Sequence, residues 1–147
     1  MNPFSLMKKD HTVVKDLFKT LERARVENRK DTLFEELRNE LDAHAYMEEK
    51  AFYPELEESK ETHDLTLEAI KEHDAVKALL KELGDMDKNG EEWKAKLTIL
   101  KENVEHHVEE EEKELFPKAR KILKGRENEI STNMQDKKQE FLDKSTK

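Results

Sequence analysis

The sequence contains no cysteine, and only three glycines and three prolines occur among its 147 residues. The lack of cysteine excludes disulfides, thiolate metal ligands and cysteine-based catalysis. The scarcity of glycine and proline argues against a turn-rich β protein. No apolar run approaches the roughly 20 residues that span a bilayer, and no basic start followed by an apolar stretch indicates secretion. We therefore expect a cytoplasmic protein without a membrane partner.

Charged residues make up 44% of the chain and hydrophobic residues only 34%, and the formal net charge is −8. This acidity argues against nucleic acid or an anionic membrane surface as a partner. The composition lies near that of disordered chains, so a folded structure has to be inferred from hydrophobic periodicity. The length suits a single domain, and abundant Glu, Lys and Leu favour helices.

Apolar residues recur at steps of three and four along four segments, which predicts four amphipathic helices. Asn2 suits the cap of the first helix, and Thr32 with Glu35 forms a capping-box pattern at the start of the second. Gly84 is expected to close the third helix in a left-handed conformation. The expected helices cover about residues 3–26, 32–54, 60–83 and 91–124.

Two stretches of the sequence recur. Residues 41–54 match residues 104–117, and residues 9–21 match residues 71–83, at shifts of 63 and 62 residues. Helices one and two therefore look like a hairpin duplicated as helices three and four. This predicts an all-α, up-down-up-down four-helix bundle with pseudo-twofold symmetry over residues 1–125. Residues 126–147 are expected to form a C-terminal tail or a short extra helix.

Four of the six histidines lie on the apolar stripes, one in each expected helix: His11, His44, His73 and His107. Glu48 and Glu111 follow the second and fourth of these by four residues and share their inward faces. A single histidine on such a stripe is more often a hydrogen-bonded core residue, and exposed His–Glu pairs are common in acidic chains. Four histidines related by a repeat favour a site, because two buried glutamates would be very costly without cations. Two divalent cations would satisfy all six groups.

The other histidines and the nearby lysines bear on this hypothesis. His63 and His106 have polar helical neighbours, so we expect both to lie in solvent. Lys15 and Lys77 follow a stripe histidine by four residues in the two copies of the repeat. Their long stems should carry the ammonium groups to water; a buried ion pair with the glutamates is the alternative.

The pattern of a His on helix one, HxxxE on helix two, a His on helix three and HxxxE on helix four resembles the hemerythrin-like, or HHE, cation-binding domain family. The resemblance covers about residues 4–124 and includes the E-E-K sequence that follows both HxxxE histidines. It implies a non-haem di-iron centre whose two carboxylates bridge the irons, usually with an oxo or hydroxo group. The ligands that it implies are His11, His44, Glu48, His73, His107 and Glu111.

One feature departs from the oxygen-carrying members of that family, which hold a further His one turn from the helix-three ligand. Here the positions one turn either side of His73 are Ala69 and Lys77. The ligand set is therefore more symmetric and contains one imidazole fewer. This argues against simple reversible oxygen carriage and leaves more coordination positions for outside ligands.

Imidazole and carboxylate ligands without thiolate suit iron, manganese or zinc, and the resemblance points to two iron ions. The outer ring nitrogens of such histidines are usually held by hydrogen bonds. The candidates for these bonds are Glu40, Asn103, Tyr46 and the polar residues beside the ligands.

The interior of a helical bundle is too narrow for a large organic substrate, so we expect small ligands such as O2, NO or H2O2. The favoured hypothesis is a protein that binds or senses one of them in an oxygen, nitrosative or oxidative stress response. The alternatives are a di-iron enzyme that decomposes H2O2 or reduces NO, and a metal-storage or structural bundle. The chain is expected to be a monomer or a weak homodimer.

Overall fold

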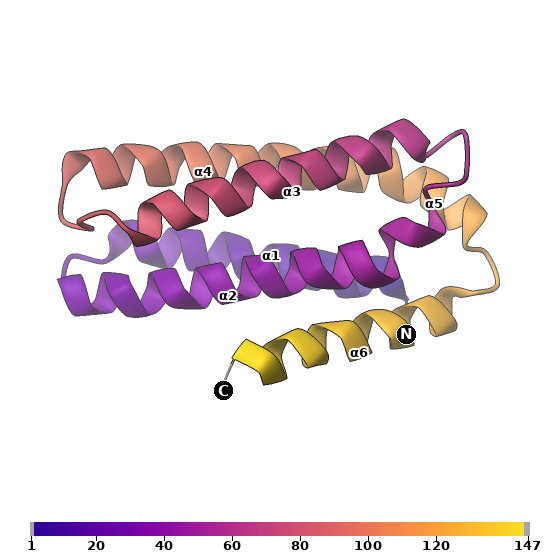
Figure 1. Cartoon of the computed structure of the whole chain (residues 1–147), viewed down its shortest axis with the longest axis horizontal. Helices are drawn as coiled ribbons and strands as arrows, with labels where there is room; N and C mark the ends of the chain where they lie inside the picture. The colour runs from indigo at the N-terminus through magenta and orange to yellow at the C-terminus, as the bar shows by residue number, and fades with distance from the viewer. Residues whose placement is uncertain (1, 146–147) are drawn as a thin grey trace.

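The structure is a computed structural model that describes residues 2–145, and this part of the chain is helical with no strand. Four long helices run alternately up and down the bundle (Figure 1). Their bounds are α1 Pro3–Arg23, α2 Glu27–Ala51, α3 His63–Gly84 and α4 Glu91–Glu110. Shorter elements follow α2 and α4, namely the 3-10 turn η1 (Tyr53–Glu55), the π-helical turn η2 (Glu111–Leu115) and α5 (Phe116–Ile122). The chain ends in α6, Glu127–Ser145. The expected four-helix bundle is confirmed.

The helix ends agree with the sequence patterns at some positions and differ at others. The Asn2 side chain accepts a hydrogen bond from the Phe4 backbone N–H at 2.7 Å, which caps α1 as expected. The expected start at Thr32 is wrong, because α2 begins at Glu27 and the Thr32 hydroxyl donates back to the Asn28 carbonyl instead of capping.

Gly84 is not the left-handed residue that we expected, because α3 continues through it. A Cβ at this position would lie 2.9 Å from Nη1 of Arg38, so the glycine provides room for the Arg38 side chain of α2. Gly125 has the positive φ, 89°, in the turn between α5 and α6.

The two copies of the repeat diverge at their prolines. Pro54 lies in η1 directly after α2, so the first copy ends its helix as expected. Before Pro117 the second copy widens into η2, where the Phe116 N–H donates to the carbonyl of Glu111, and the helix continues as α5. The chain then turns back at Gly125 and enters α6.

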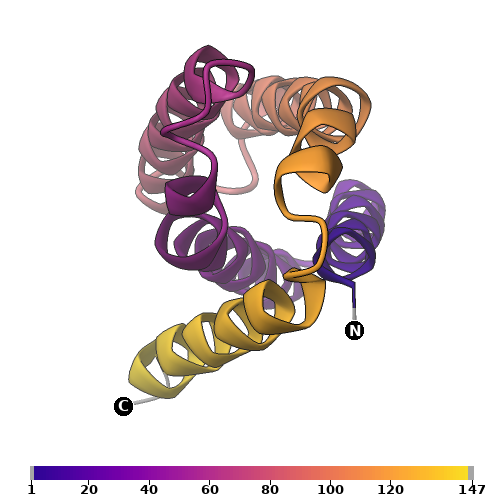
Figure 2. The same ribbon diagram turned by 90° about the vertical axis from the view of Figure 1, so that its right-hand side faces the viewer.

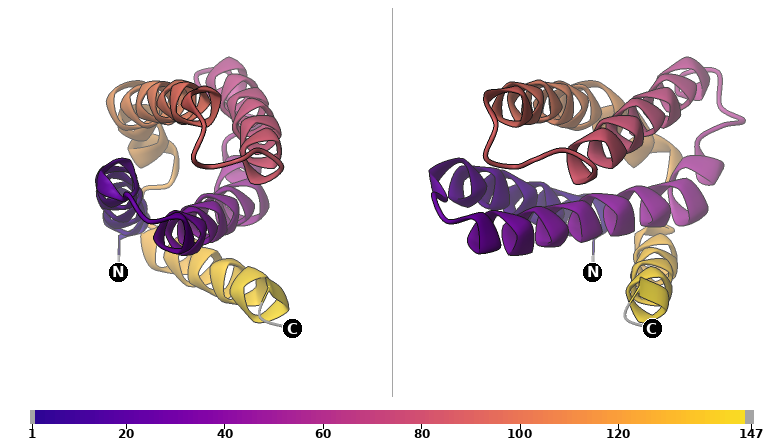
Figure 3. Two further views of the ribbon diagram at one scale, coloured as in Figure 1. Left: turned by 90° about the vertical axis from the view of Figure 1, so that its left-hand side faces the viewer. Right: turned by 60° about the vertical axis from the view of Figure 1, so that its left-hand side comes forward.

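Helix α6 lies outside the four-helix ring and crosses the outer face of α1 and α2 (Figures 2 and 3). The sequence left open whether this segment forms a tail or a short extra helix, and the structure shows a helix of 19 residues. It buries Ile130 and Met134, and the Phe141 ring packs on Tyr46 with centroids 5.6 Å apart. None of the helices described, in residues 2–145, is long and apolar enough to cross a membrane.

The core consists of two apolar clusters, one toward each end of the bundle. The first apolar cluster includes Phe4, Met7, Phe52, Phe116 and Met134. The second apolar cluster includes Phe18, Leu37, Leu80, Trp93 and Leu100. Along α1, His11 stands between the residues of the two clusters, and His44 does the same along α2. A layer of polar side chains therefore crosses the bundle between them.

Candidate metal centre

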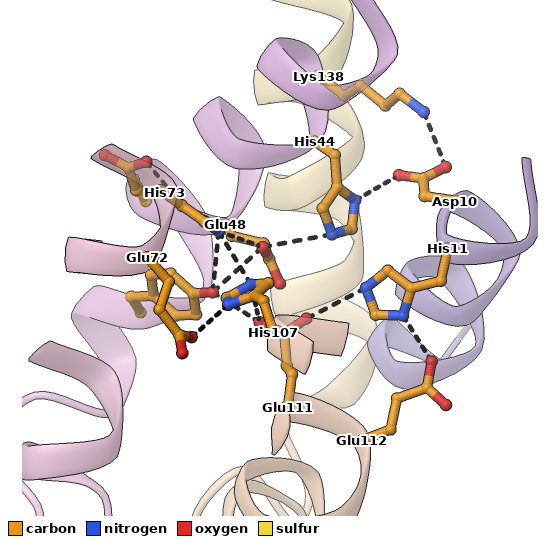
Figure 4. Close-up of polar contacts among 12 residues, drawn as sticks. Asp10, His11, His44, Glu48, Glu72, His73, His107, Glu111, Glu112 and Lys138 are labelled. Atoms are coloured by element: carbon orange, nitrogen blue, oxygen red, sulfur yellow. Dashed lines mark hydrogen bonds and ion pairs between the residues drawn. The ribbon is translucent and has the colours of Figure 1, made fainter. Parts of the chain in front are cut away.

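The polar layer brings together all six residues that the sequence singled out. Each of α1, α2, α3 and α4 contributes one histidine, α2 adds Glu48, and the first residue of η2 is Glu111 (Figure 4). None of the six is more than 9% exposed. On α2 and across the α4–η2 junction, each glutamate follows a histidine by one helical turn. The glutamate and the histidine therefore lie on the same face.

Each imidazole directs its Nε2 atom toward a carboxylate oxygen at the bundle axis. The Nε2–oxygen distances are 3.2 Å for His11–Glu111, 3.3 Å for His44–Glu48, 3.1 Å for His73–Glu48 and 3.5 Å for His107–Glu111. The donor atoms form two groups in which all of them lie within 4.8 Å of one another. The first group is His11, His44, Glu48 and Glu111, and the second group is Glu48, His73 and His107.

Several of these inward atoms have no hydrogen-bond partner although they are buried. They are His11 Nε2, His44 Nε2, Glu48 Oε2 and Glu111 Oε1. An unsatisfied buried polar atom costs about 1–3 kcal/mol, so four in one place require a compensating group. Imidazole nitrogen and carboxylate oxygen are both common metal donors. The residues present therefore fit metal ions in this layer.

The outer nitrogen of each histidine donates to a carboxylate, which leaves Nε2 facing inward. The Nδ1–oxygen distances are 2.6 Å for His11–Glu112, 2.9 Å for His44–Asp10, 2.8 Å for His73–Glu49 and 2.7 Å for His107–Glu72. All four carboxylates belong to residues next to an inward-facing histidine or glutamate in the sequence. Of the candidates named above, the polar residues beside the ligands are the ones that serve, whereas Glu40 contacts Lys138 and Tyr46 contacts Glu140.

The charges of the layer depend on one another. Burial alone would lower the pKa of His44, but Glu48 and Asp10 outweigh it and raise that pKa to about 10. The pKa values of His73 and His107 are also raised against the effect of burial by their carboxylate partners. Burial would raise the pKa of Glu111, but the neighbouring imidazoles of His107 and His11 hold it well below its usual range. Without metal, protons on the imidazoles thus supply the positive charge that the two buried glutamates need.

Tyr53 is a member of this layer that the sequence patterns did not reveal. Its hydroxyl lies 2.6 Å from Glu111 Oε2, 3.2 Å from Glu48 Oε1 and 3.3 Å from His73 Nε2. Burial, together with the charges of Glu111 and Glu48, raises the pKa of Tyr53 well above its usual range, so the phenol keeps its proton and donates. The repeat matches Tyr53 with Phe116, a buried core residue, and this correspondence makes Tyr53 look like a packing residue.

An apolar cavity of about 40 Å³ adjoins the four histidines on the side of the second apolar cluster. A water molecule needs roughly 10–15 Å³ of such space, so the cavity holds a molecule of two or three heavy atoms. It is lined by the four histidines and mainly by aliphatic side chains, including Val14, Leu41, Val76, Val104 and Val108. The layer therefore has a phenol on one side and an apolar space on the other.

The remaining histidines and the lysines lie where the sequence predicted. His106 is exposed, with 66% of its side chain open to solvent, and the exposed His63 donates to the Glu57 carbonyl. Lys15 is exposed, and the Lys77 ammonium lies at the surface 3.5 Å from Glu49. The alternative, in which these lysines form buried ion pairs with Glu48 and Glu111, is therefore wrong.

The fold and the buried His–Glu layer define a cation-binding helical bundle. The chain matches the Hemerythrin HHE cation binding domain over residues 2–119, and it belongs to this family. A crystal structure of a Hemerythrin HHE cation binding domain-containing protein from Mycobacterium kansasii superimposes with a TM-score of 0.84. The two are 25% identical, and the match covers 96% of this chain and 87% of that one.

Another relative carries a different description. A protein described as a DNA nickase from Nostoc sp. is 29% identical over 129 residues, which are 88% of this chain. The match covers only 36% of the Nostoc protein.

Proposed function

We propose that the protein is a non-haem di-iron protein that binds a small ligand, O2, NO or a peroxide, inside its helical bundle. Its role would be the sensing of, or response to, oxygen, nitrosative or oxidative stress in the cytoplasm, as a monomer or weak homodimer. The observation that carries the proposal is the buried layer of donor atoms, which form two groups that share Glu48. Four of these atoms, from His11, His44, Glu48 and Glu111, have no hydrogen-bond partner.

The donor chemistry supports two metal positions that share a carboxylate. The first group would hold one ion through two imidazoles and two carboxylates, and the second group would hold another through two imidazoles and Glu48. Donors without thiolate suit iron, manganese or zinc, and membership of the hemerythrin family favours iron. Iron bound here supplies one-electron redox chemistry and coordination positions that a small ligand can occupy.

The surroundings of the site support a small ligand. The cavity of about 40 Å³ has room for a diatomic molecule or H2O2, but not for an organic substrate. Its walls are mainly aliphatic away from the four histidines, although Asp42 and Lys77 also line it. Ala69, buried one turn from His73, supplies no further imidazole, so the position beside His73 stays available to an outside ligand.

A second candidate function is the decomposition of H2O2, in which two molecules of H2O2 give one O2 and two H2O. Tyr53 favours it, because its phenol keeps a proton against the buried Glu111 and can hold that carboxylate in place while protons move. Steady release of O2 on addition of H2O2 would distinguish the enzyme from a protein that only binds the ligand.

Metal analysis of the purified protein, before and after anaerobic loading with Fe²⁺, tests the proposal. We expect about two irons per chain, and lower occupancy and stability in His73→Ala and Glu111→Ala, because the other donors then lose a partner. His106→Ala is the matched control and should change neither, since its side chain is exposed. Failure to take up iron, or equal loss of metal in His106→Ala, would contradict the proposal.

A further inference from the structure

A chain of contacts joins the C-terminal helix to one histidine of the metal layer (Figure 4). Lys138 of α6 donates to Asp10 Oδ1 at 2.8 Å and to Glu40 Oε1 at 2.9 Å. The other oxygen of Asp10 accepts from His44 Nδ1 at 2.9 Å. The ammonium group of Lys138 is therefore two contacts away from the inward-facing Nε2 of His44.

The four carboxylates that accept hydrogen bonds from the histidine Nδ1 atoms differ in their exposure to solvent. The side chain of Asp10 is 7% exposed, whereas those of Glu49, Glu72 and Glu112 are 22–31% exposed and can also be hydrated. Glu72 corresponds to Asp10 in the internal repeat, but its second neighbour is the exposed His106 at 4.0 Å. The difference arises because α6 packs on α1 and α2, and no helix within residues 2–145 packs in the same way on α3 and α4 (Figure 2).

The buried Asp10 carboxylate depends on its two partners. His44 Nδ1 donates to one oxygen of Asp10 and the Lys138 ammonium group donates to the other. If Lys138 were neutral, Asp10 and Glu40 would lose their shared cation in a largely buried place, at a substantial cost. Asp10 would then turn toward water, and His44 would lose the acceptor that fixes its ring orientation.

We propose that Lys138 is a positioning residue for the first group alone: through Asp10 it holds His44 Nε2 toward His11, Glu48 and Glu111. The inference rests on the proposed function, since it concerns the binding of two metal ions. It makes the two metal positions unequal, although the repeat makes their inner donors similar. Mutation of a residue that forms a hydrogen bond to a metal-binding histidine typically lowers metal affinity about 10–100-fold.

The test compares Lys138→Met with Lys137→Met in the full-length protein. Methionine keeps most of the lysine stem and removes the charge. Lys137 lies on the same helix, but its ammonium group contacts Glu140 within α6 at 3.1 Å instead of Asp10. Titration with Co²⁺ against a competing chelator, followed by its visible absorption, measures the affinity for each ion.

We expect Lys138→Met to bind one of the two ions about 10–100-fold more weakly while the other affinity stays unchanged. Lys137→Met should keep both affinities. Asp10→Asn should weaken the same ion, and the double variant should be no weaker than Asp10→Asn alone, because both changes break one chain of contacts. Asp10→Asn also gives the answer if Lys138→Met does not fold.

An equal weakening of both ions in Lys138→Met would show a general effect on the fold and overturn the inference. Unchanged affinities in both Lys138→Met and Asp10→Asn would overturn it as well. Failure of the unaltered protein to bind two ions would instead overturn the proposed function, so the two failures are distinguishable.

Discussion

The stability of the metal-free protein should fall as the pH rises from about 7 to about 9. His44 titrates at 6.5 in an ordinary environment and at about 10 in the folded protein. A proton held more tightly in the folded state stabilises it fully below the lower value. That stabilisation is lost as the pH rises through the higher one.

The magnitude follows from the difference between the two pKa values. For each proton that the folded state binds and the unfolded state does not, the free energy of unfolding falls by about 1.4 kcal/mol per unit rise in pH. For His44 alone this amounts to about 2–3 kcal/mol between about pH 7 and about pH 9. His73 and His107 act in the same direction, because their pKa values are also raised.

Urea unfolding of chelator-treated protein at several pH values measures this effect. His44→Gln should reduce the slope by about one proton, whereas the exposed His106→Gln should leave it unchanged. Saturation with metal should abolish most of the dependence, because metal displaces the protons. If the metal-free protein is equally stable at both ends of this pH range, the imidazoles are neutral in the folded state and the reasoning is refuted.

Further expectations concern the phenol, the cavity and the distant relative. Tyr53→Phe should lower the free energy of unfolding of the metal-free protein by about 1.5–3 kcal/mol, the value of a hydrogen bond to a charged group. Tyr46→Phe, whose hydroxyl donates to Glu140 at the surface, should cost less in the same urea experiment. Val76→Phe should weaken NO binding by the Fe²⁺-loaded protein at unchanged iron content, since Val76 lines the cavity, whereas the exposed Val13→Phe should not. Supercoiled plasmid should stay intact and unshifted with the protein, because a net charge of −8 repels DNA; nicking would contradict this.

Most of the bundle was predictable because its information is local or repeated. Helical periodicity located four segments, and the repeat alone related His11 to His73 and His44 to His107. The outer carboxylates were present in the same repeated motifs, as the residues beside the inner histidines and glutamates. To predict their hydrogen bonds, one would need to know only how each helix is rotated about its own axis.

The features that were not predictable depend on contacts between distant parts of the chain. The start of α2 was misjudged because no side chain caps its N-terminus at Val26, so tertiary packing decides where the helix begins. Tyr53 lies in an aromatic–proline sequence whose second copy holds a core phenylalanine. The role of Lys138 depends on α6 folding back over the first hairpin, a contact across 128 residues of sequence.

The polar layer between the two apolar clusters has a consequence for the lifetime of the protein in the cell. Buried charges in the middle of a bundle weaken the folded state when nothing compensates them, and a bound ion adds stability in proportion to the logarithm of its concentration over its dissociation constant. Chains made during metal shortage would therefore open more often and expose cleavable backbone to proteases. On the proposed function, the amount of this protein would follow the supply of metal by selective degradation, without any change in its synthesis.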